Sequence, residues 1–274
     1  MAEGFTCEVE TPFPPPWVGD EEEIEGQDYR NACRALPFYG EHEGKRYCVL
    51  HFPGEEKRDG FEQVKKSKLA QKDYNFCGAI FPEGTSDFFS WYEFDADVDF
   101  TGAVFVGSAN FSFAQFSGKE THFEGAQFSG KRTDFLAAQF SGAGTDFSAA
   151  QFSSERTDFS AAQFGAEETS FLNTTFLKSV FFTSANFEHR VTFWGSENAV
   201  FDENARARFV HVRIDNPALL TFYKVFLRPN WFINVDVRKV DFTEVQWYGL
   251  PGGPSGTLDE EIGALKKDQI KTPY

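Results

Sequence analysis

The chain has 274 residues, enough for one large domain or two small ones. Its 42 acidic residues outnumber 26 Lys and Arg, and the formal net charge of −16 argues against a protein that binds nucleic acid or anionic membranes. No apolar run approaches the ~20 residues of a membrane helix, and the first ten residues lack the features of a signal peptide. We therefore expect a cytoplasmic protein without a membrane segment.

Residues 1–73 share no repeat with the rest of the chain and are expected to form a small, irregular N-terminal cap. Within them, Cys48 and His51 are three residues apart, so that one tight turn can aim both side chains at a single ion. Zinc in proteins takes four ligands, typically Cys thiolates and His nitrogens. Adding Cys7 and Cys33 completes such a set, and the sequence predicts one structural Zn²⁺ held by these four residues.

Two alternatives to this metal site stay open at the level of sequence. The four side chains can instead be buried reduced thiols and a surface histidine, which a cytosolic chain easily carries. His42 is the substitute ligand if Cys7 is disordered, and a disulfide is not expected in a reducing compartment.

Residues 59–72 suit a short amphipathic helix, with Phe61, Val64 and Leu69 on its apolar side. A repeat structure needs such a cap, because an open edge invites pairing with other chains. The lysines between these apolar residues are expected on the solvated side of the helix. They are Lys65, Lys66, Lys68 and Lys72.

Phenylalanine recurs through the middle of the chain at gaps that alternate between five and seven residues. Such a twelve-residue unit fits neither the 3.6-residue period of a helix nor the two-residue period of a strand, and it indicates a solenoid in which each unit buries its Phe against the next. The most regular positions are Phe111, Phe116, Phe123, Phe128, Phe135, Phe140, Phe147, Phe152, Phe159, Phe164, Phe171 and Phe176.

Each Phe belongs to a five-residue word such as AQFSG at 126–130 or TDFSA at 145–149. The small residue two before the Phe points the same way as the ring in an extended segment, so both are expected inside, while the Gln or Asp between them faces water. These words resemble those of the pentapeptide-repeat family. The resemblance implies an all-β, right-handed quadrilateral parallel β-helix over residues 74–249, with four words to a coil.

A two-residue spacer, such as Lys131 and Arg132, follows every second word and lengthens a coil to 24 residues. The rival geometry has twelve residues per coil and stacks Asp134, Asp146 and Asp158 in one column, where like charges repel. In the wider coil only Asp134 and Asp158 are neighbours, and we prefer it.

The repeat is interrupted at about residues 216–229, between two prolines, where apolar residues form a helical stripe. We expect a short helical insertion there and a last coil after it, up to residue 249. Residues 250–274 are expected to be a linker and a short helix that begins at the capping box Thr257 to Glu260, and whether the natural chain continues past Tyr274 stays open.

No catalytic constellation or phosphate-binding loop is present in the sequence, so we expect a non-enzymatic scaffold that binds a protein partner rather than nucleic acid. The exposed ends of a solenoid leave a homodimer possible. The resemblance to the family implies one alternative, an acidic rod that mimics DNA and inhibits a DNA-binding enzyme such as gyrase. Spacers that mix Lys and Arg with Glu weaken that alternative.

Overall fold

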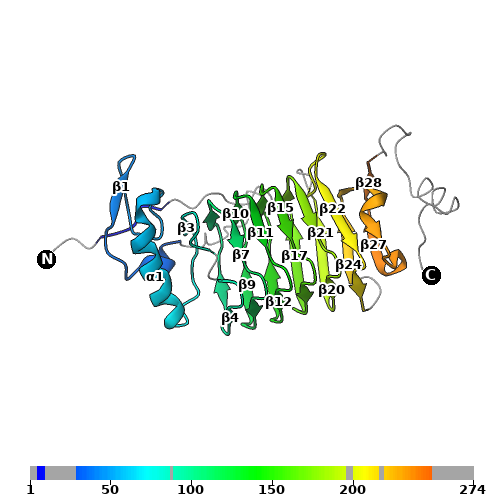
Figure 1. Ribbon diagram of the computed structural model, residues 1–274, viewed down its shortest axis with the longest axis horizontal. Helices are drawn as coiled ribbons and strands as arrows, with labels where there is room; N and C mark the ends of the chain where they lie inside the picture. The colour runs from blue at the N-terminus through cyan, green and yellow to red at the C-terminus, as the bar shows by residue number, and fades with distance from the viewer. Residues whose placement is uncertain (1–4, 10–28, 87–88, 196–199, 216–218, 249–274) are drawn as a thin grey trace, which may run out of the picture.

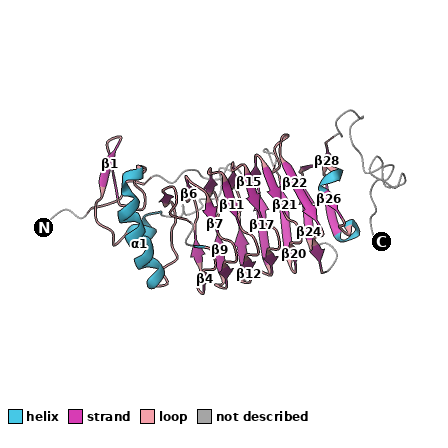
Figure 2. Ribbon diagram, viewed as in Figure 1, coloured by secondary structure: helices cyan, strands magenta, loops and turns pink. Residues whose placement is uncertain are grey.

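The protein is a rod of stacked β-coils with a small cap at its N-terminal end (Figure 1), as seen in a computed structural model. The structure describes residues 5–9, 29–86, 89–195, 200–215 and 219–248. About seven coils follow one another along the rod, and nearly all of its regular structure is β-strand (Figure 2). The fold is therefore the expected parallel β-solenoid.

The chain visits four parallel sheets in a fixed order, and each regular coil contributes one short strand to each of them. The first sheet holds β3 (Ile80–Phe81), β6 (Val104–Phe105), β10 (Gln127–Phe128), β14 (Gln151–Phe152) and β18 (Thr175–Phe176). The second holds β7 (Ala109–Asn110), β11 (Arg132–Asp134), β15 (Arg156–Asp158), β19 (Ser179–Phe181), β22 (Arg206–Val210) and β26 (Phe232–Ile233).

The third and fourth sheets complete the coil. The third holds β4 (Glu93–Phe94), β8 (Gln115–Phe116), β12 (Gln139–Phe140), β16 (Gln163–Phe164), β20 (Asn186–Phe187) and β23 (Arg213–Ile214). The fourth holds β5 (Val98–Asp99), β9 (Glu120–His122), β13 (Gly144–Asp146), β17 (Glu168–Leu172), β21 (Arg190–Trp194), β24 (Leu220–Tyr223) and β27 (Val240–Thr243). The second and fourth sheets are two steps apart in this order and form opposite faces of the rod.

The register confirms the 24-residue coil. Asp134 pairs with Asp158 in the second sheet, whereas Asp146 lies in the fourth sheet between His122 and Ser170. The twelve-residue coil is therefore excluded, and the carboxylate of Asp146 is kept on the face opposite the other two.

The interior is filled by the phenylalanine rings, which stack on the rings one coil before and after. The Phe147 ring is fully buried and lies 5.0 Å from Phe123 and 4.9 Å from Phe171, with ring planes 5° and 3° apart. Rings from adjacent words in the same coil meet edge to face, as Phe147 does with Phe140 at 5.8 Å. Both arrangements are favourable for aromatic pairs, so the Phe rings pack against one another along the axis of the rod.

The outward Asp of a word also makes the corner that follows it. Asp146 accepts a hydrogen bond from the backbone N–H of Ser148 at 2.7 Å, and Asp158 does the same for Ser160 at 2.9 Å. Such a bond to the residue two positions on favours a tight turn. The residue after Ser148, Ala149, then has a positive φ of 56°, which completes the corner.

The cap combines a hairpin with three short helical segments. Strands β1 (Gly40–His42) and β2 (Lys45–Tyr47) are antiparallel, and residues 5–9 run beside β2, with the Glu8 N–H donating to the Arg46 carbonyl at 2.8 Å. The helical segments are η1 (Tyr29–Cys33), η2 (Glu55–Lys57) and α1 (Arg58–Ala70). Helix α1 lies across the N-terminal end of the rod (Figure 1), as expected for residues 59–72.

The expectation that the lysines of residues 59–72 face water is wrong for two of the four. Lys65 and Lys68 are buried, and their ammonium groups donate to the carbonyl oxygens of Thr85 and Ala32 and pair with Glu62 and Asp73. Lys66 and Lys72 are exposed as expected. A long side chain can bury its stem while its charged end reaches acceptors, and periodicity alone does not reveal that.

The predicted helical insertion at residues 216–229 is also wrong. Leu220–Tyr223 is strand β24, which pairs with β21 and β27, and Phe226–Leu227 is strand β25, which pairs with β28 (Gln246–Trp247). The Phe222 ring stacks between Phe193 and Phe242, so this stretch is one more word whose flanking Leu and Val imitate a helical stripe. Two short helical segments, η4 (Pro229–Trp231) and η5 (Val237–Lys239), lie in the last coil. The predicted linker and helix of residues 250–274 lie outside the described residues.

Candidate metal centre

The four predicted ligands meet in the cap at its junction with the rod. Cys7 comes from the extended segment beside β2, and Cys33 ends η1. Cys48 and His51 lie in one turn after β2, closed by a hydrogen bond from the His51 N–H to the Cys48 carbonyl at 3.2 Å. Cys48 and His51 are therefore the local pair that their three-residue spacing predicts. Cys7 and Cys33 reach this pair from segments that are far away in the sequence.

The ligand atoms form a compact group. All four lie within 4.8 Å of one another, and the His51 Nδ1 atom is 3.4 Å from the Cys7 sulfur and 3.3 Å from the Cys48 sulfur. A tetrahedral zinc with Zn–S bonds of about 2.3 Å sets its ligand atoms roughly 3.4 to 3.8 Å apart. The four side chains are at least nine-tenths buried, so the group has the size and enclosure of a closed, four-ligand metal site.

The other nitrogen of the His51 ring orients the imidazole. Its Nε2 atom lies 3.0 Å from the backbone carbonyl of Cys77, which can only accept, so Nε2 carries the proton and Nδ1 faces the sulfurs as a potential ligand. A hydrogen bond of this kind fixes the tautomer of metal-binding histidines. Because Cys77 belongs to the first coil, the same bond ties the ligand set to the rod.

The protonation of the group favours a cation. Hydrogen bonds with Cys33 and Cys48 hold the pKa of Cys7 far below its usual value, while hydrogen bonds with Cys48 and Cys7 raise the pKa of Cys33. Burial lowers the pKa of His51, but its bonds to Cys48 and Cys7 outweigh burial and raise that pKa to about 9. The group thus concentrates negative charge on sulfur beside an imidazolium, and a bound metal would replace these protons.

A buried lysine that the sequence did not single out completes the surroundings. Lys57 is fully buried, its ammonium group donates to the Leu50 carbonyl at 2.7 Å, and it lies 4.9 Å from the centre of the Phe61 ring. Burial lowers its pKa to about 7, an effect that the charges of Cys48 and Glu55 oppose. Nothing in the run Glu55, Glu56, Lys57 distinguishes this lysine from its exposed neighbours, so only the folded cap identifies it.

The substitute ligand lies apart from this group, since His42 is half exposed beside Glu43 and is not needed. Cys77 is buried and contributes its backbone carbonyl to His51, but its sulfur is not among the four clustered ligand atoms. A surface depression of about 290 Å³ adjoins the cluster. It is lined by Phe5, Thr6, Cys7, Arg30, Cys33, Arg34 and Leu36.

Comparison with known proteins finds no similar protein. No family model, no curated protein and no solved structure matches the chain, so the resemblance to pentapeptide repeats rests on its own words and on the four-sided solenoid that they form. Within the described residues, no helix has the length and apolar character needed to cross a bilayer.

Proposed function

We propose that the protein is a non-enzymatic scaffold, a rigid rod whose faces bind a protein partner and whose N-terminal cap is held by one Zn²⁺. The observation that carries this proposal is the ring ladder. Rings stacked from Phe76 to Phe242 fill the rod, which leaves its flat, polar faces as the surface on which recognition can occur.

In this proposal Cys7, Cys33, Cys48 and His51 hold the zinc as a structural ion. Four protein ligands leave no open position for substrate, which is typical of structural rather than catalytic zinc. Three thiolates and a neutral imidazole around Zn²⁺ carry a net charge of −1, and this charge would favour the protonated form of the buried Lys57, in the same direction as the charges of Cys48 and Cys7 act on its pKa. The ion would join residues 5–9, η1 and the Cys48 turn, three segments that are far apart in the sequence.

Metal content tests this part of the proposal. We expect mass spectrometry of protein purified without chelator to find one zinc per chain in the wild type and in Cys77→Ser, a buried cysteine outside the group. The Cys48→Ser variant should lose the ion. Absence of metal from all three proteins would reduce the four residues to buried thiols and a histidine, the alternative open from the sequence.

Affinity capture tests the scaffold. The folded chain, used as bait in an extract of its own cells, should enrich a protein at near-stoichiometric amounts over an unrelated bait of equal net charge. Enrichment that is the same for both baits would contradict the proposal, because it would reflect only the −16 charge.

The DNA-mimic alternative has one feature in its favour. The fourth sheet carries Asp99, Glu120, Asp146 and Glu168 on successive coils. On the opposite face, however, Arg132 and Arg156 form ion pairs with the aspartates, and three of the six strands of the third sheet carry an outward Gln. Among the described residues these two sheets form no regular negative column, so we prefer the scaffold.

A further inference from the structure

The charge of the rod is divided between two opposite faces. We call the second sheet the basic face and the fourth sheet the acidic face. Within their strands the basic face has four arginines against two aspartates, and the acidic face has five carboxylates against one arginine. The basic face carries Arg132, Arg156, Arg206, Arg208, Asp134 and Asp158, and the acidic face Asp99, Glu120, Asp146, Glu168, Asp241 and Arg190.

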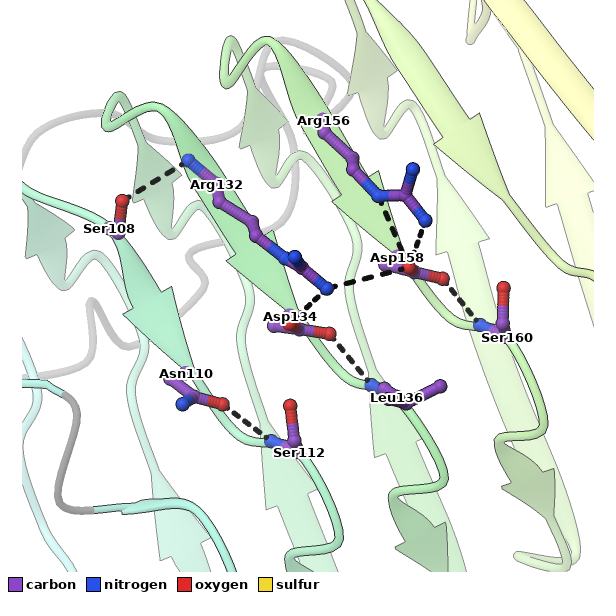
Figure 3. A network of polar contacts seen from close by, with 9 residues as sticks. All are labelled: Ser108, Asn110, Ser112, Arg132, Asp134, Leu136, Arg156, Asp158 and Ser160. Carbon is purple, nitrogen blue, oxygen red and sulfur yellow. Dashed lines mark hydrogen bonds and ion pairs between the residues drawn. The ribbon is translucent and has the colours of Figure 1, made fainter.

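The first half of the basic face compensates its own charge (Figure 3). The Arg132 guanidinium reaches the carboxylates of both Asp134, at 2.6 Å, and Asp158, at 3.8 Å. Arg156 donates to Asp158 through Nε at 3.2 Å and through a terminal nitrogen at 2.6 Å. Each guanidinium lies beside a carboxylate of its own or the next coil, so this half offers no uncompensated charge.

The pattern breaks at the next coil. Phe181 takes the position in β19 that Asp158 holds in β15, and the Arg156 guanidinium lies 4.2 Å from the centre of its ring. One coil further, β22 places Arg206 beside Ser179 and Arg208 beside Phe181. Both arginines are exposed and have no ion pair with any described residue.

Apolar side chains border these two arginines. Phe181 and Val210 are partly exposed, and Ile233, paired with Val210 in the next strand, is 36% exposed. In the earlier coils Asn110, Asp134 and Asp158 hold the position of Phe181, so at this end an apolar ring replaces a polar side chain. We call Phe181, Arg206, Arg208, Val210 and Ile233 the arginine patch.

We propose that the arginine patch binds an extended acidic segment of a partner protein, with carboxylates at alternate positions and an apolar residue between them. Arg206 and Arg208 are two residues apart on one strand, about 6.6 Å, which matches residues i and i+2 of an extended peptide. Guanidinium groups bind carboxylates through two parallel hydrogen bonds. The peptide carboxylates would thus continue the arginine and aspartate ladder that Phe181 interrupts.

The proposal rests on the scaffold function. It favours an acidic peptide as the ligand of the arginine patch over nucleic acid and over a second copy of this chain. Nucleic acid carries a phosphate at every residue and would meet strong repulsion from a chain of charge −16, whereas two carboxylates need only local compensation within a Debye length of about 8 Å. A second copy of this chain would bring its acidic face but also the same net charge. An acidic peptide pairs with both arginines of the patch and adds less negative charge than nucleic acid or a second copy would.

Fluorescence anisotropy tests the proposal on the full chain. The probe is a labelled ten-residue peptide of alternating Glu and Val, and the control probe carries Gln in place of Glu. We expect the Glu peptide to bind at least tenfold more tightly than the Gln peptide. The variant R206Q/R208Q should lose at least tenfold in affinity, whereas R190Q/R213Q, exposed arginines on the fourth and third sheets, should stay within about twofold of the wild type.

Three outcomes would overturn the proposal. Equal binding of the two probes, or equal affinity of the two double variants, would show that the patch does not read carboxylates. Tighter, Arg206-dependent binding of a single-stranded oligonucleotide of the same charge would assign the patch to nucleic acid. Self-association in sedimentation velocity that R206Q/R208Q abolishes, without peptide binding, would assign it to a second copy.

The capture experiment separates this proposal from the scaffold function. If R206Q/R208Q captures the same protein as the wild type in the same amount, the partner binds another face, and the patch proposal fails while the scaffold stands. If no protein is captured although the Glu peptide binds, the scaffold fails while the patch keeps its preference for carboxylates.

Discussion

Two glycines at equivalent corners, Gly102 and Gly125, show that a position can require glycine either for its backbone conformation or for the close approach of another side chain. Gly102 has a φ of +62°, and a Cβ there would overlap the Tyr29 hydroxyl. Gly125, one coil further along the same corner, has a φ of +63° but open space around its Cα. The corner conformation is shared, whereas the close approach of Tyr29 occurs at Gly102, as it does at Gly78, and not at Gly125.

We predict that Gly125→Ala lowers the free energy of unfolding by about 1 kcal/mol, because an alanine must adopt the left-handed conformation. Gly102→Ala should cost about 2 to 4 kcal/mol, since Tyr29 must also leave its place. Urea titration of both variants measures the difference. Equal losses would show that Tyr29 does not rest on this corner.

At the centre of the ladder, we predict that Phe147→Ala costs about 3 to 5 kcal/mol, because rings stacked on both sides cannot close the cavity. Phe181→Ala is the matched control, since this ring faces outward on β19 and its loss should cost less than about 1 kcal/mol. Chemical denaturation compares the two. A similar cost for both would contradict the assignment of inward and outward positions.

At the scale of the strand, two aspartates in equivalent words differ only in what lies beside them. Asp158 and Asp146 both close a corner, but only Asp158 pairs with arginines. Burial raises the pKa of Asp158, while its bonds to Ser160 and Arg156 outweigh burial and leave the pKa below its usual value. The carboxylate form is therefore stabilised by folding.

We predict that Asp158→Asn lowers the free energy of unfolding by about 1 to 3 kcal/mol at pH 7, because the ion pairs are lost while the corner bond can remain. A folded pKa below the unfolded value means that this stabilisation is present above about pH 4 and is lost as the pH falls through the folded pKa. The stabilities of variant and wild type should thus converge in acid. Asp146→Asn should cost less than about 1 kcal/mol, and a pH dependence equal to that of Asp158→Asn would contradict the ion-pair assignment.

The elements also show where sequence reasoning succeeded and where it could not. The words around Phe147 predicted the coil length and the neighbours of Asp146, because each position repeats many times and its environment is averaged over the ladder. The word containing Phe222 imitates a helix because it occurs once, with Leu220 in the position that Thr or Val holds in the earlier coils of the fourth sheet. The buried ends of Lys65 and Lys68 depend on acceptors in other segments, which no local pattern encodes.

The cluster of Cys7, Cys33, Cys48 and His51 was predictable for a different reason. The tight spacing of Cys48 and His51 is a local signal, and few other cysteines were present to complete the set. The carbonyl of Cys77 and the ammonium of Lys57 were not predictable, since the fold alone brings them to the group. Arg208 could have been found by aligning the words, because the earlier coils carry Asn, Asp or Phe at its position. Arg206 follows Arg132 and Arg156 in register, so alignment alone does not distinguish it.

For the whole molecule, the division of charge between opposite faces predicts the result of a gyrase assay. A rod with paired arginines on one face does not present the negative surface of a duplex on all sides. We therefore expect no inhibition of DNA supercoiling at sub-micromolar protein. Inhibition in that range would favour the DNA mimic over the scaffold.

The ladder also has a consequence for how such a chain can change its length. The words repeat every twelve residues, but a residue meets its equivalent only after 24, as Asp134 meets Asp158. Duplication of a full coil would lengthen the rod by about 4.8 Å and leave every face intact. Insertion of twelve residues would preserve all the buried rings but would exchange the basic and acidic faces in every coil that follows. Such an insertion would leave the core unchanged and alter the charge of the surface.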